Sequence, residues 1–416
     1  MEKKKKPEIR FRGFSEDWEQ RKLGSVGTTY AGLSGKTKED FGHGNGQFVT
    51  YMNVFSNPVG SPDMTEAVEI DDSQNKVLFG DVLFTTSSET PDEVGMSSVW
   101  LENTENTYLN SFCFGYRPTV EFNPYYLAYM LRSSSMRKKI TFLAQGISRY
   151  NISKSQIMNI EIPIPNIDEQ KQIGSYFHHL DHLITLHQRK LEKLQNFKKS
   201  MLEKMFPQND SKTPQIRFKG FTNDWEQRKF NEIGIVIDPH PSHRAPKEVE
   251  NGIPFIGIGD VDEMGNINKQ SARLVSESIY DEHRRRYDLS IPSLGLGRVA
   301  SLGKVIRLRS DIEKYTVSPT LSVLQFAQSI NIDYTYAYMN SPGFKKQFES
   351  KSNGSTRQSV GTETVRILDL SIPNSMDEQQ KIGTFFINLD HLITLHQRKL
   401  EKLQNIKKSM LEKMFV

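Results

Sequence analysis

Several acidic residues lie where a metal-dependent nuclease site could begin. Asp63 and Asp92 each follow a proline, the spacing with which a catalytic carboxylate cluster often opens. A working site needs further ligands, and no acidic-x-Lys pair follows either aspartate within about 30 residues. Glu349-Ser350-Lys351 supplies such a pair without the preceding aspartate. We therefore expect no catalytic carboxylate site in this chain.

Other motifs lack a residue that their chemistry needs. Three histidines within 178–182 have no glutamate placed as in a zinc protease, and the glycine pairs at 257–259 and 295–297 lack the third glycine of a dinucleotide loop. Asn123-Pro124-Tyr125-Tyr126 resembles the N-P-P-[YF] loop of adenine methyltransferases without its second proline. We interpret it as a helix start, with Asn as N-cap and Pro in the first turn. No Walker A motif is present, so the chain is predicted to be non-catalytic, with no metal site.

Two basic segments carry residue types that suit contacts with DNA. Residues 24–105 hold 3 Lys against 13 Asp and Glu, a net −10, whereas residues 106–165 hold 7 basic against 2 acidic residues, a net +5. Arg, Gln and Asn suit base edges, and Lys suits phosphates. The predicted DNA-contacting residues are Arg137, Lys138, Lys139, Gln145, Arg149 and Asn151, with Arg298, Lys345, Lys346, Arg357 and Gln358 in the second half. A solvated surface helix and loop would show the same charges.

These residues belong to a chain that repeats itself. Residues 7–22 and 214–229 both read P-x-I-R-F-[RK]-G-F-x-x-D-W-E-Q-R-K, and residues 181–206 match 390–415 at all positions except Phe197 against Ile406. The segments between these blocks are unlike, although both end in G-x-x-R, a short aliphatic alternation and Ile-Pro. The chain is therefore two cassettes, each with a short stub, a variable body and a constant tail.

Each tail carries apolar residues at alternating spacings of 4 and 3, which predicts a long helix with a coiled-coil seam. A helix of about 38 residues would be about 57 Å long. We expect the two tails to pair antiparallel around a pseudo-twofold axis. The predicted seam residues are Ile173, Phe177, Leu180, Ile184, His187, Leu191 and Leu194, and Ile382, Phe386, Leu389, Ile393, His396, Leu400 and Leu403. The histidines, with Lys198 and Lys407, either fix the register or extend to solvent; zinc binding is the remote alternative.

The bodies mix short strands and helices, so the predicted class is α+β. We expect strands at 77–84, 97–101, 253–258, 304–308 and 320–326, and helices from Asn123 to about Phe142 and from Asp333 to about Glu349. The expected segments are a stub at 1–23, bodies at 24–165 and 229–372, tail helices at 166–206 and 373–416, and a linker with the repeated stub at 207–228.

Composition limits the class of protein. The chain has 416 residues, a net charge of +4 and one cysteine, Cys113, which excludes an internal disulfide. A reducing, cytoplasmic environment is the expectation. No apolar run reaches the roughly 18 residues of a membrane span.

The layout resembles the specificity subunits of type I restriction-modification enzymes. The twice-used stub, the body that ends in G-x-x-R and hydrophobic-Pro before D-E-Q, and the tandem tails carry the resemblance over the whole chain. It implies two target recognition domains, held apart by the tail helices, that each read one half of a split site in double-stranded DNA. It also implies two methylation subunits that bind S-adenosylmethionine and two restriction subunits that use ATP and Mg²⁺, with this chain directing their adenine methylation or restriction.

Two other classes of protein remain as alternatives. A coiled-coil adaptor could join two binding modules without touching nucleic acid, and protection of a bipartite DNA sequence would distinguish the two. A self-sufficient methyltransferase would need to bind its cofactor within this chain, which the incomplete motif at Asn123 argues against.

Overall fold

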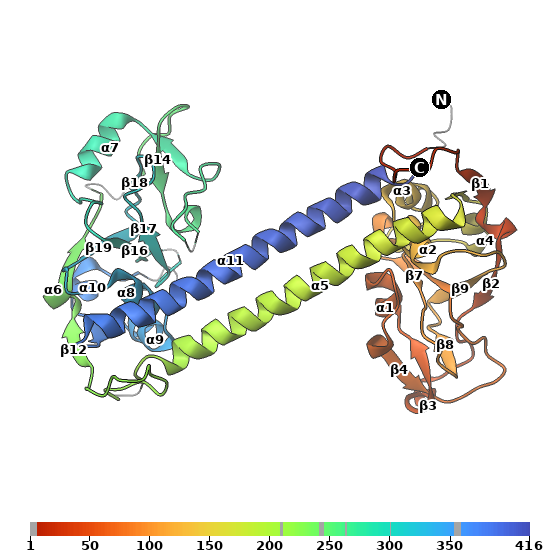
Figure 1. Cartoon of the computed structure of the whole chain (residues 1–416), viewed down its shortest axis with the longest axis horizontal. Coiled ribbons are helices and arrows are strands. Elements are labelled where there is room, and N and C mark those ends of the chain that lie inside the picture. Colours follow the sequence, from red (N-terminus) through yellow and green to blue (C-terminus); the bar gives the residue numbers. More distant parts are fainter. Residues whose placement is uncertain (1–5, 209–210, 241–244, 263, 300, 353–358) are drawn as a thin grey trace. The chain divides into compact units, whose positions relative to one another are not determined.

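The computed structural model describes residues 6–208, 211–240, 245–262, 264–299, 301–352 and 359–416. It divides into two compact units, Met1–His187 with Lys399–Val416, and Gln188–Arg398. Each unit holds one body and parts of both long helices, α5 (Ile167–Lys204) and α11 (Met376–Lys413) (Figure 1). In the described part of the chain, no helix is both long and apolar enough to cross a membrane.

The first body is built on two small sheets. A four-stranded antiparallel sheet has the order β2 (Gly27–Ala31), β9 (Cys113–Pro118), β5 (Val82–Thr85), β7 (Ser97–Val99). A three-stranded sheet has the order β4 (Thr65–Val68), β3 (Phe41–Val49), β8 (Thr107–Leu109), with β3 and β8 parallel. Two further pairs are β1 (Glu19–Lys22) with β11 (Glu161–Ile164), and β6 (Ser87–Ser88) with β10 (Tyr150–Asn151). The helices are α1 (Tyr51–Ser56), α2 (Pro124–Met130), α3 (Ser134–Phe142) and α4 (Lys154–Met158).

The second body repeats this topology. Its four-stranded antiparallel sheet has the order β13 (Gly234–Ile237), β19 (Leu321–Phe326), β16 (Ser293–Gly297), β17 (Val305–Leu308). Its three-stranded sheet has the order β15 (Arg273–Val275), β14 (Ile253–Ile256), β18 (Thr316–Val317), again with one parallel pair. Strands β12 (Glu226–Lys229) and β20 (Asp369–Ile372) pair as β1 and β11 do. The helices are α6 (Phe230–Ile233), α7 (Glu277–Arg284), α8 (Ile332–Met339), α9 (Pro342–Ser350) and α10 (Thr362–Arg366). Two unlike sequences therefore adopt one α+β fold, as predicted.

The prediction of one continuous helix at the end of each body is wrong. The first breaks between α2 and α3, where the side chain of Ser133 accepts a hydrogen bond from Met136 N and so caps a new helix. The second breaks between α8 and α9, where Ser341 caps and Pro342 occupies the first turn. Serine at an N-cap offers the backbone an alternative to continuing the helix, because its hydroxyl satisfies an otherwise unpaired N–H group.

The strand predicted at 77–84 is shorter than expected. Leu78 to Asp81 form a turn, in which Asp81 N donates to Leu78 O and Leu78 N donates to the Asp81 carboxylate. Gly80 adopts a positive φ of 87° there, a conformation that glycine reaches without strain. The strand therefore begins only at Val82. The other predicted strands are present within one or two residues of their expected ends.

Both tail helices have the predicted length of 38 residues. All predicted seam residues are buried or half-buried, and the buried ones gather toward the start of each helix, where it leaves its body. In the first unit, Phe177 stacks on Phe415 at 5.6 Å between ring centroids, and Asp181 pairs with Lys407 at 2.5 Å. Because the partner number falls as the α5 number rises, the helices run antiparallel there, as predicted.

Candidate nucleic-acid interface

The repeated stub and the repeated tail are joined by a buried ion pair. Glu169, with its side chain fully buried, accepts two hydrogen bonds from Arg10, at 2.6 and 2.8 Å, and one from Trp18 Nε1 at 3.0 Å. In the second unit Glu378 accepts the same bonds from Arg217 and Trp225. A buried carboxylate needs such donors because burial removes its hydration. The stub therefore fixes each body to its own tail.

A glutamine and a glycine complete this junction. Gln170 accepts a hydrogen bond from Asn123 N and donates to Pro165 O. Asn123 in turn caps α2 by accepting from Tyr126 N, which confirms its interpretation as a helix start. A Cβ at Gly174 would lie 2.5 Å from Asn123 Oδ1, so glycine is needed for α5 to pack this closely. Asn331, Gln379 and Gly383 repeat the arrangement in the second unit.

The polar residues of the tail helices include two ion pairs between helices. Lys407 of α11 pairs with Asp181 of α5 in the first unit, and Lys198 of α5 pairs with Asp390 of α11 in the second. These lysines are therefore paired with carboxylates, which agrees with a role in fixing register. Asp181 and Asp390 lie outside the seam positions, so the periodicity did not identify them. Among the described residues, no group of three possible metal ligands is present.

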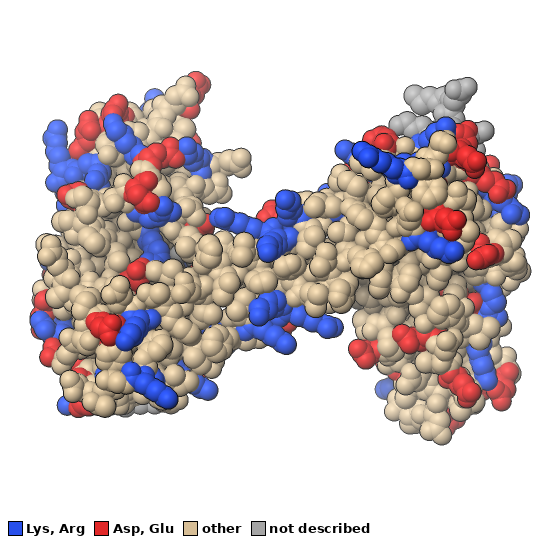
Figure 2. Space-filling model, viewed as in Figure 1, with Lys and Arg blue, Asp and Glu red and all other residues tan. Residues whose placement is uncertain are grey.

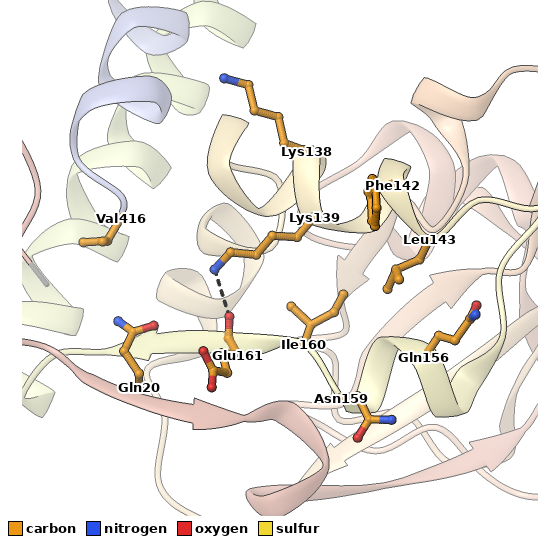
Figure 3. Close-up of a pocket in the computed structure, with 10 residues that line it drawn as sticks. All are labelled: Gln20, Lys138, Lys139, Phe142, Leu143, Gln156, Asn159, Ile160, Glu161 and Val416. Atoms are coloured by element: carbon orange, nitrogen blue, oxygen red, sulfur yellow. Dashed lines mark hydrogen bonds between the residues drawn. The ribbon is translucent and has the colours of Figure 1, made fainter. Parts of the chain in front are cut away.

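Lys138 and Lys139 lie on the exposed face of α3, beside a largely apolar pocket of about 740 Å³ (Figure 3). Lys139 Nζ donates to Glu161 O at 3.0 Å, so its ammonium lies across the end of the β1–β11 pair. The second unit has a pocket at the equivalent place, about 950 Å³ in volume, with Lys346 and Gln347 on its wall. Gln347 donates to Asp369 O at 3.0 Å, which reproduces the bond from Lys139. Lys345 is exposed beside it, with a pKa below the ordinary value because of desolvation and then the charge of Lys198.

Gln145, Arg149 and Asn151 lie together in one closed loop. The backbones of Gln145 and Asn151 exchange both hydrogen bonds, at 2.9 and 2.8 Å, and the residues between them are exposed or half-exposed. The Arg149 guanidinium lies 6.0 Å from the ring centroid of Phe112, itself 56% exposed. Among the described residues, no carboxylate pairs with Arg149. The loop therefore presents a cation to solvent.

Two residues predicted to contact DNA, Arg137 and Arg298, donate hydrogen bonds to the protein's own backbone. The Arg137 guanidinium donates to three backbone carbonyls, Asp92 O, Val94 O and Gly95 O, at 2.6 to 2.9 Å, and burial lowers its pKa to about 10. Arg298 is 8% exposed and donates to Pro319 O at 3.2 Å. Both side chains therefore hold loops in place, and their contact with DNA stays a prediction. Arg357 and Gln358 lie outside the described residues.

Sequence patterns missed the residues that line a second pocket and two exposed leucine pairs. A pocket of about 660 Å³ is lined by Tyr51, Met52, Phe55, Ser87, Ser88, Glu89, Glu93, Ser148 and Arg149. The first three belong to α1, whose six residues are too few to show a helical period.

On the tail helices, Leu183 and Leu186 are 42% and 47% exposed, and Leu392 and Leu395 repeat them at 42% and 39%. Their outward position follows from their offset from the seam.

Charge on the face drawn in Figure 2 is mixed over both bodies, while Lys and Arg side chains gather along the tail helices. Such a surface has no single broad basic patch in that view.

Comparison with known proteins agrees with this duplicated architecture. The family model of the type I restriction modification DNA specificity domain matches the chain twice, at residues 15–196 and 222–405. The chain belongs to this family and carries two recognition domains.

Relatives extend over nearly the whole chain. A Methanocaldococcus jannaschii protein described as the specificity subunit MjaX of a type I restriction enzyme is 22% identical over 95% of this chain and 92% of its own length. The MjaVIII specificity subunit from the same organism is 23% identical over 67% of both chains. The crystal structure of a type I restriction-modification S subunit from M. genitalium aligns over 99% of both chains, with a TM-score of 0.63 and 15% identity. The predicted family and fold are confirmed.

Proposed function

We propose that this chain selects the DNA target of a type I restriction-modification complex, with each body binding one half of a bipartite site. The observation that supports this most directly is the duplication itself: one framework of stub and tail contacts holds two bodies of the same topology and unlike sequence. Two different readers on equivalent supports suit a target made of two different half-sites. Pseudo-twofold readers commonly meet half-sites about one helical turn apart.

The catalytic steps of such a complex belong to other subunits in this proposal. Two methylation subunits would bind S-adenosylmethionine, and two restriction subunits would use ATP and Mg²⁺. The repeat supports a partner in two copies, because each unit presents an equivalent exposed leucine pair on a tail helix. Exposed apolar side chains at repeated positions are typical of protein interfaces.

The test is to express the chain with its methylation partner and to map methylated adenines across a genome by sequencing. We expect one bipartite, asymmetric sequence to be methylated only when this chain is present. A footprint on a duplex that contains this sequence should cover both halves. If the purified complex protects no DNA sequence, the chain functions as an adaptor without nucleic acid.

A further inference from the structure

The loop from Gln145 to Asn151 carries two residues that the first body shares with the second. Gly146 and Arg149 recur as Gly354 and Arg357. The residue that follows the loop is anchored alike in both bodies: Ile152 N donates to Thr86 O at 2.9 Å, and Val360 N donates to Arg298 O at 3.0 Å. The residue that follows each G-x-x-R segment is therefore anchored at a corresponding place in the two bodies.

The glycine of this loop has a structural reason to recur. Gly146 has a φ of 143°, and a Cβ there would lie 2.0 Å from Arg149 O. Only glycine allows this tight path, because any side chain would collide with the backbone that carries Arg149. The path presents the arginine at the surface, beside the face of Phe112.

The segments that follow the corresponding strands β3 and β14 differ between the bodies. In the first body, α1 follows β3 and contributes Tyr51, Met52 and Phe55 to the adjacent pocket. In the second body, the chain after β14 makes a single 3-10 turn, Ile258–Asp260. In the first body, Arg149 therefore lies next to side chains of a helix that has no counterpart after β14 in the second body.

The recurring arginine and the side chains found only in the first body suit two different kinds of DNA contact. A residue shared by two bodies that read different half-sites cannot discriminate between those half-sites. It can contact only what the half-sites have in common, and the phosphate backbone is common to every DNA sequence. Arginine suits phosphate because its guanidinium donates two parallel hydrogen bonds.

Apart from Arg149, the polar side chains that line the adjacent pocket are acidic or neutral. Glu89 and Glu93 line it with Ser87 and Ser88, and carboxylates repel phosphate. Carboxylate oxygens instead accept hydrogen bonds from exocyclic amino groups such as cytosine N4. The pocket therefore matches a base edge, not the backbone.

We propose that Arg149 binds a DNA phosphate irrespective of sequence and that the adjacent pocket at Glu89 and Glu93 reads a base of the first half-site. This inference rests on the proposed function. It changes the role first expected of Arg149 from a possible base contact to a backbone anchor.

The experiment uses the complete chain assembled with its methylation partner and measures affinity for target and unrelated duplexes over a range of salt. We expect Arg149→Ala to lower the affinity for the target duplex and for the unrelated duplex by a similar factor of about ten. The slope of log affinity against log salt concentration should fall in magnitude by about one. The methylated sequence should not change. Arg149→Lys should restore most of the affinity, and Lys38→Ala, which removes an exposed cation of the same body outside the loop, should not change the slope.

Glu89→Gln tests the second part of the proposal, the reading of a base by the pocket. It should lower discrimination at one position of the first half-site by about tenfold while the salt slope does not fall. A changed methylation sequence in Arg149→Ala would show that Arg149 reads bases and would overturn the proposal. If Arg149→Ala left DNA binding unchanged but prevented assembly with the methylation partner, the loop would contact that partner. If Arg149→Ala changed neither property, the loop would contact neither DNA nor the partner. Either result would also overturn the proposal. Failure of the proposed function itself would already be visible in the unmodified complex.

Discussion

At the scale of single residues, the buried carboxylates of the junctions hold this protein together most directly. Glu169 is completely buried and receives three hydrogen bonds from the stub, which is more than 150 residues away in sequence. Such a pair need not stabilise more than apolar residues would, but breaking it by removing one partner leaves a buried charge unpaired.

We expect Glu169→Gln to lower the free energy of unfolding of the first unit by about 3 kcal/mol, because Arg10 loses the charge that compensates it. Chemical denaturation of the complete chain measures this. Glu192→Gln, on the exposed face of the same helix, is the matched control and should change stability by less than about 0.5 kcal/mol. Glu378→Gln should destabilise the second unit equally. Equal stability of Glu169→Gln and the control would contradict this account of the junction.

A buried histidine makes the second body sensitive to acid. His283 is fully buried, and its Nδ1 lies 2.7 Å from the Thr316 hydroxyl. Desolvation, followed by the nearby His240 and Arg286, lowers its pKa from 6.5 to about 4. The His240 ring is 4.3 Å away between centroids, so a proton on His283 would meet a second titratable ring.

The sign of the pH dependence follows from this depressed pKa. Between pH 6.5 and 4 the unfolded chain binds a proton at this histidine and the folded chain does not, so stability falls as the pH drops through that window. Unfolding of the second unit, followed from pH 7.5 to 4, should show this loss. His283→Gln should reduce the slope of the unfolding free energy against pH by the amount that corresponds to the uptake of about one proton on unfolding. His179→Gln, at an exposed position of α5, should leave it unchanged; an unaltered slope in His283→Gln would assign the acid sensitivity to other groups.

At the scale of elements, the close approach of α2 to α5 depends on a glycine in the middle of a helix. Alanine is normally better there by about 1 kcal/mol. At Gly174, however, a Cβ would lie 2.5 Å from Asn123 Oδ1 and 2.8 Å from Tyr126 N, both at the start of α2. The steric conflict should outweigh the helix propensity.

Gly174→Ala is therefore expected to destabilise the first unit by about 1–3 kcal/mol, measured as a lower midpoint of thermal unfolding. Gly383→Ala should do the same in the second unit, where the corresponding contacts are 2.8 and 2.9 Å. Thr384→Ala, an exposed neighbour on α11, is the control and should be neutral or slightly stabilising. A stabilising Gly174→Ala would show that α2 can move away at no cost.

The same elements show what sequence can and cannot predict. The tail helices were predictable to within a residue or two, since ten turns of regular apolar spacing leave no alternative. The helix breaks at Ser133 and Ser341 were not, because serine also occurs inside helices and only the cap hydrogen bond distinguishes the two cases. The shared topology of the bodies was also hidden, because their strands are short and unlike in sequence.

The candidate DNA contacts were also only partly predictable from the sequence. Residue type alone predicted both Arg137 and Arg149 to contact DNA. In the structure, Arg137 donates to backbone carbonyls of the protein, whereas Arg149 is exposed. The carbonyls that hold Arg137 belong to residues more than 40 positions away, so no local pattern reveals them. The G-x-x-R repeat was the useful signal, because recurrence in two unlike bodies separates a shared role from a specific one.

At the scale of the whole molecule, the contacts that recur are made by the residues that recur. The stub arginine and tryptophan, the tail glutamate and glutamine, and the interhelical lysine–aspartate pairs all appear twice. The bodies vary in sequence between them while keeping one topology. Such a framework accepts different recognition surfaces without changing its own contacts, which is what a target-selecting subunit requires.

The tail helices also predict how target spacing should respond to length, because each is one continuous helix that begins in one unit and ends in the other. Four residues inserted after His187 and four after His396 would add about 6 Å to both helices. At about 3.4 Å per base pair, the gap between half-sites should grow by one or two base pairs while the half-sites stay the same. Sequencing of methylated adenines measures both. The same four residues inserted after Ser211, in the linker outside the helices, should leave the gap unchanged. If the helix insertions also left it unchanged, the tails would not set the spacing of the target.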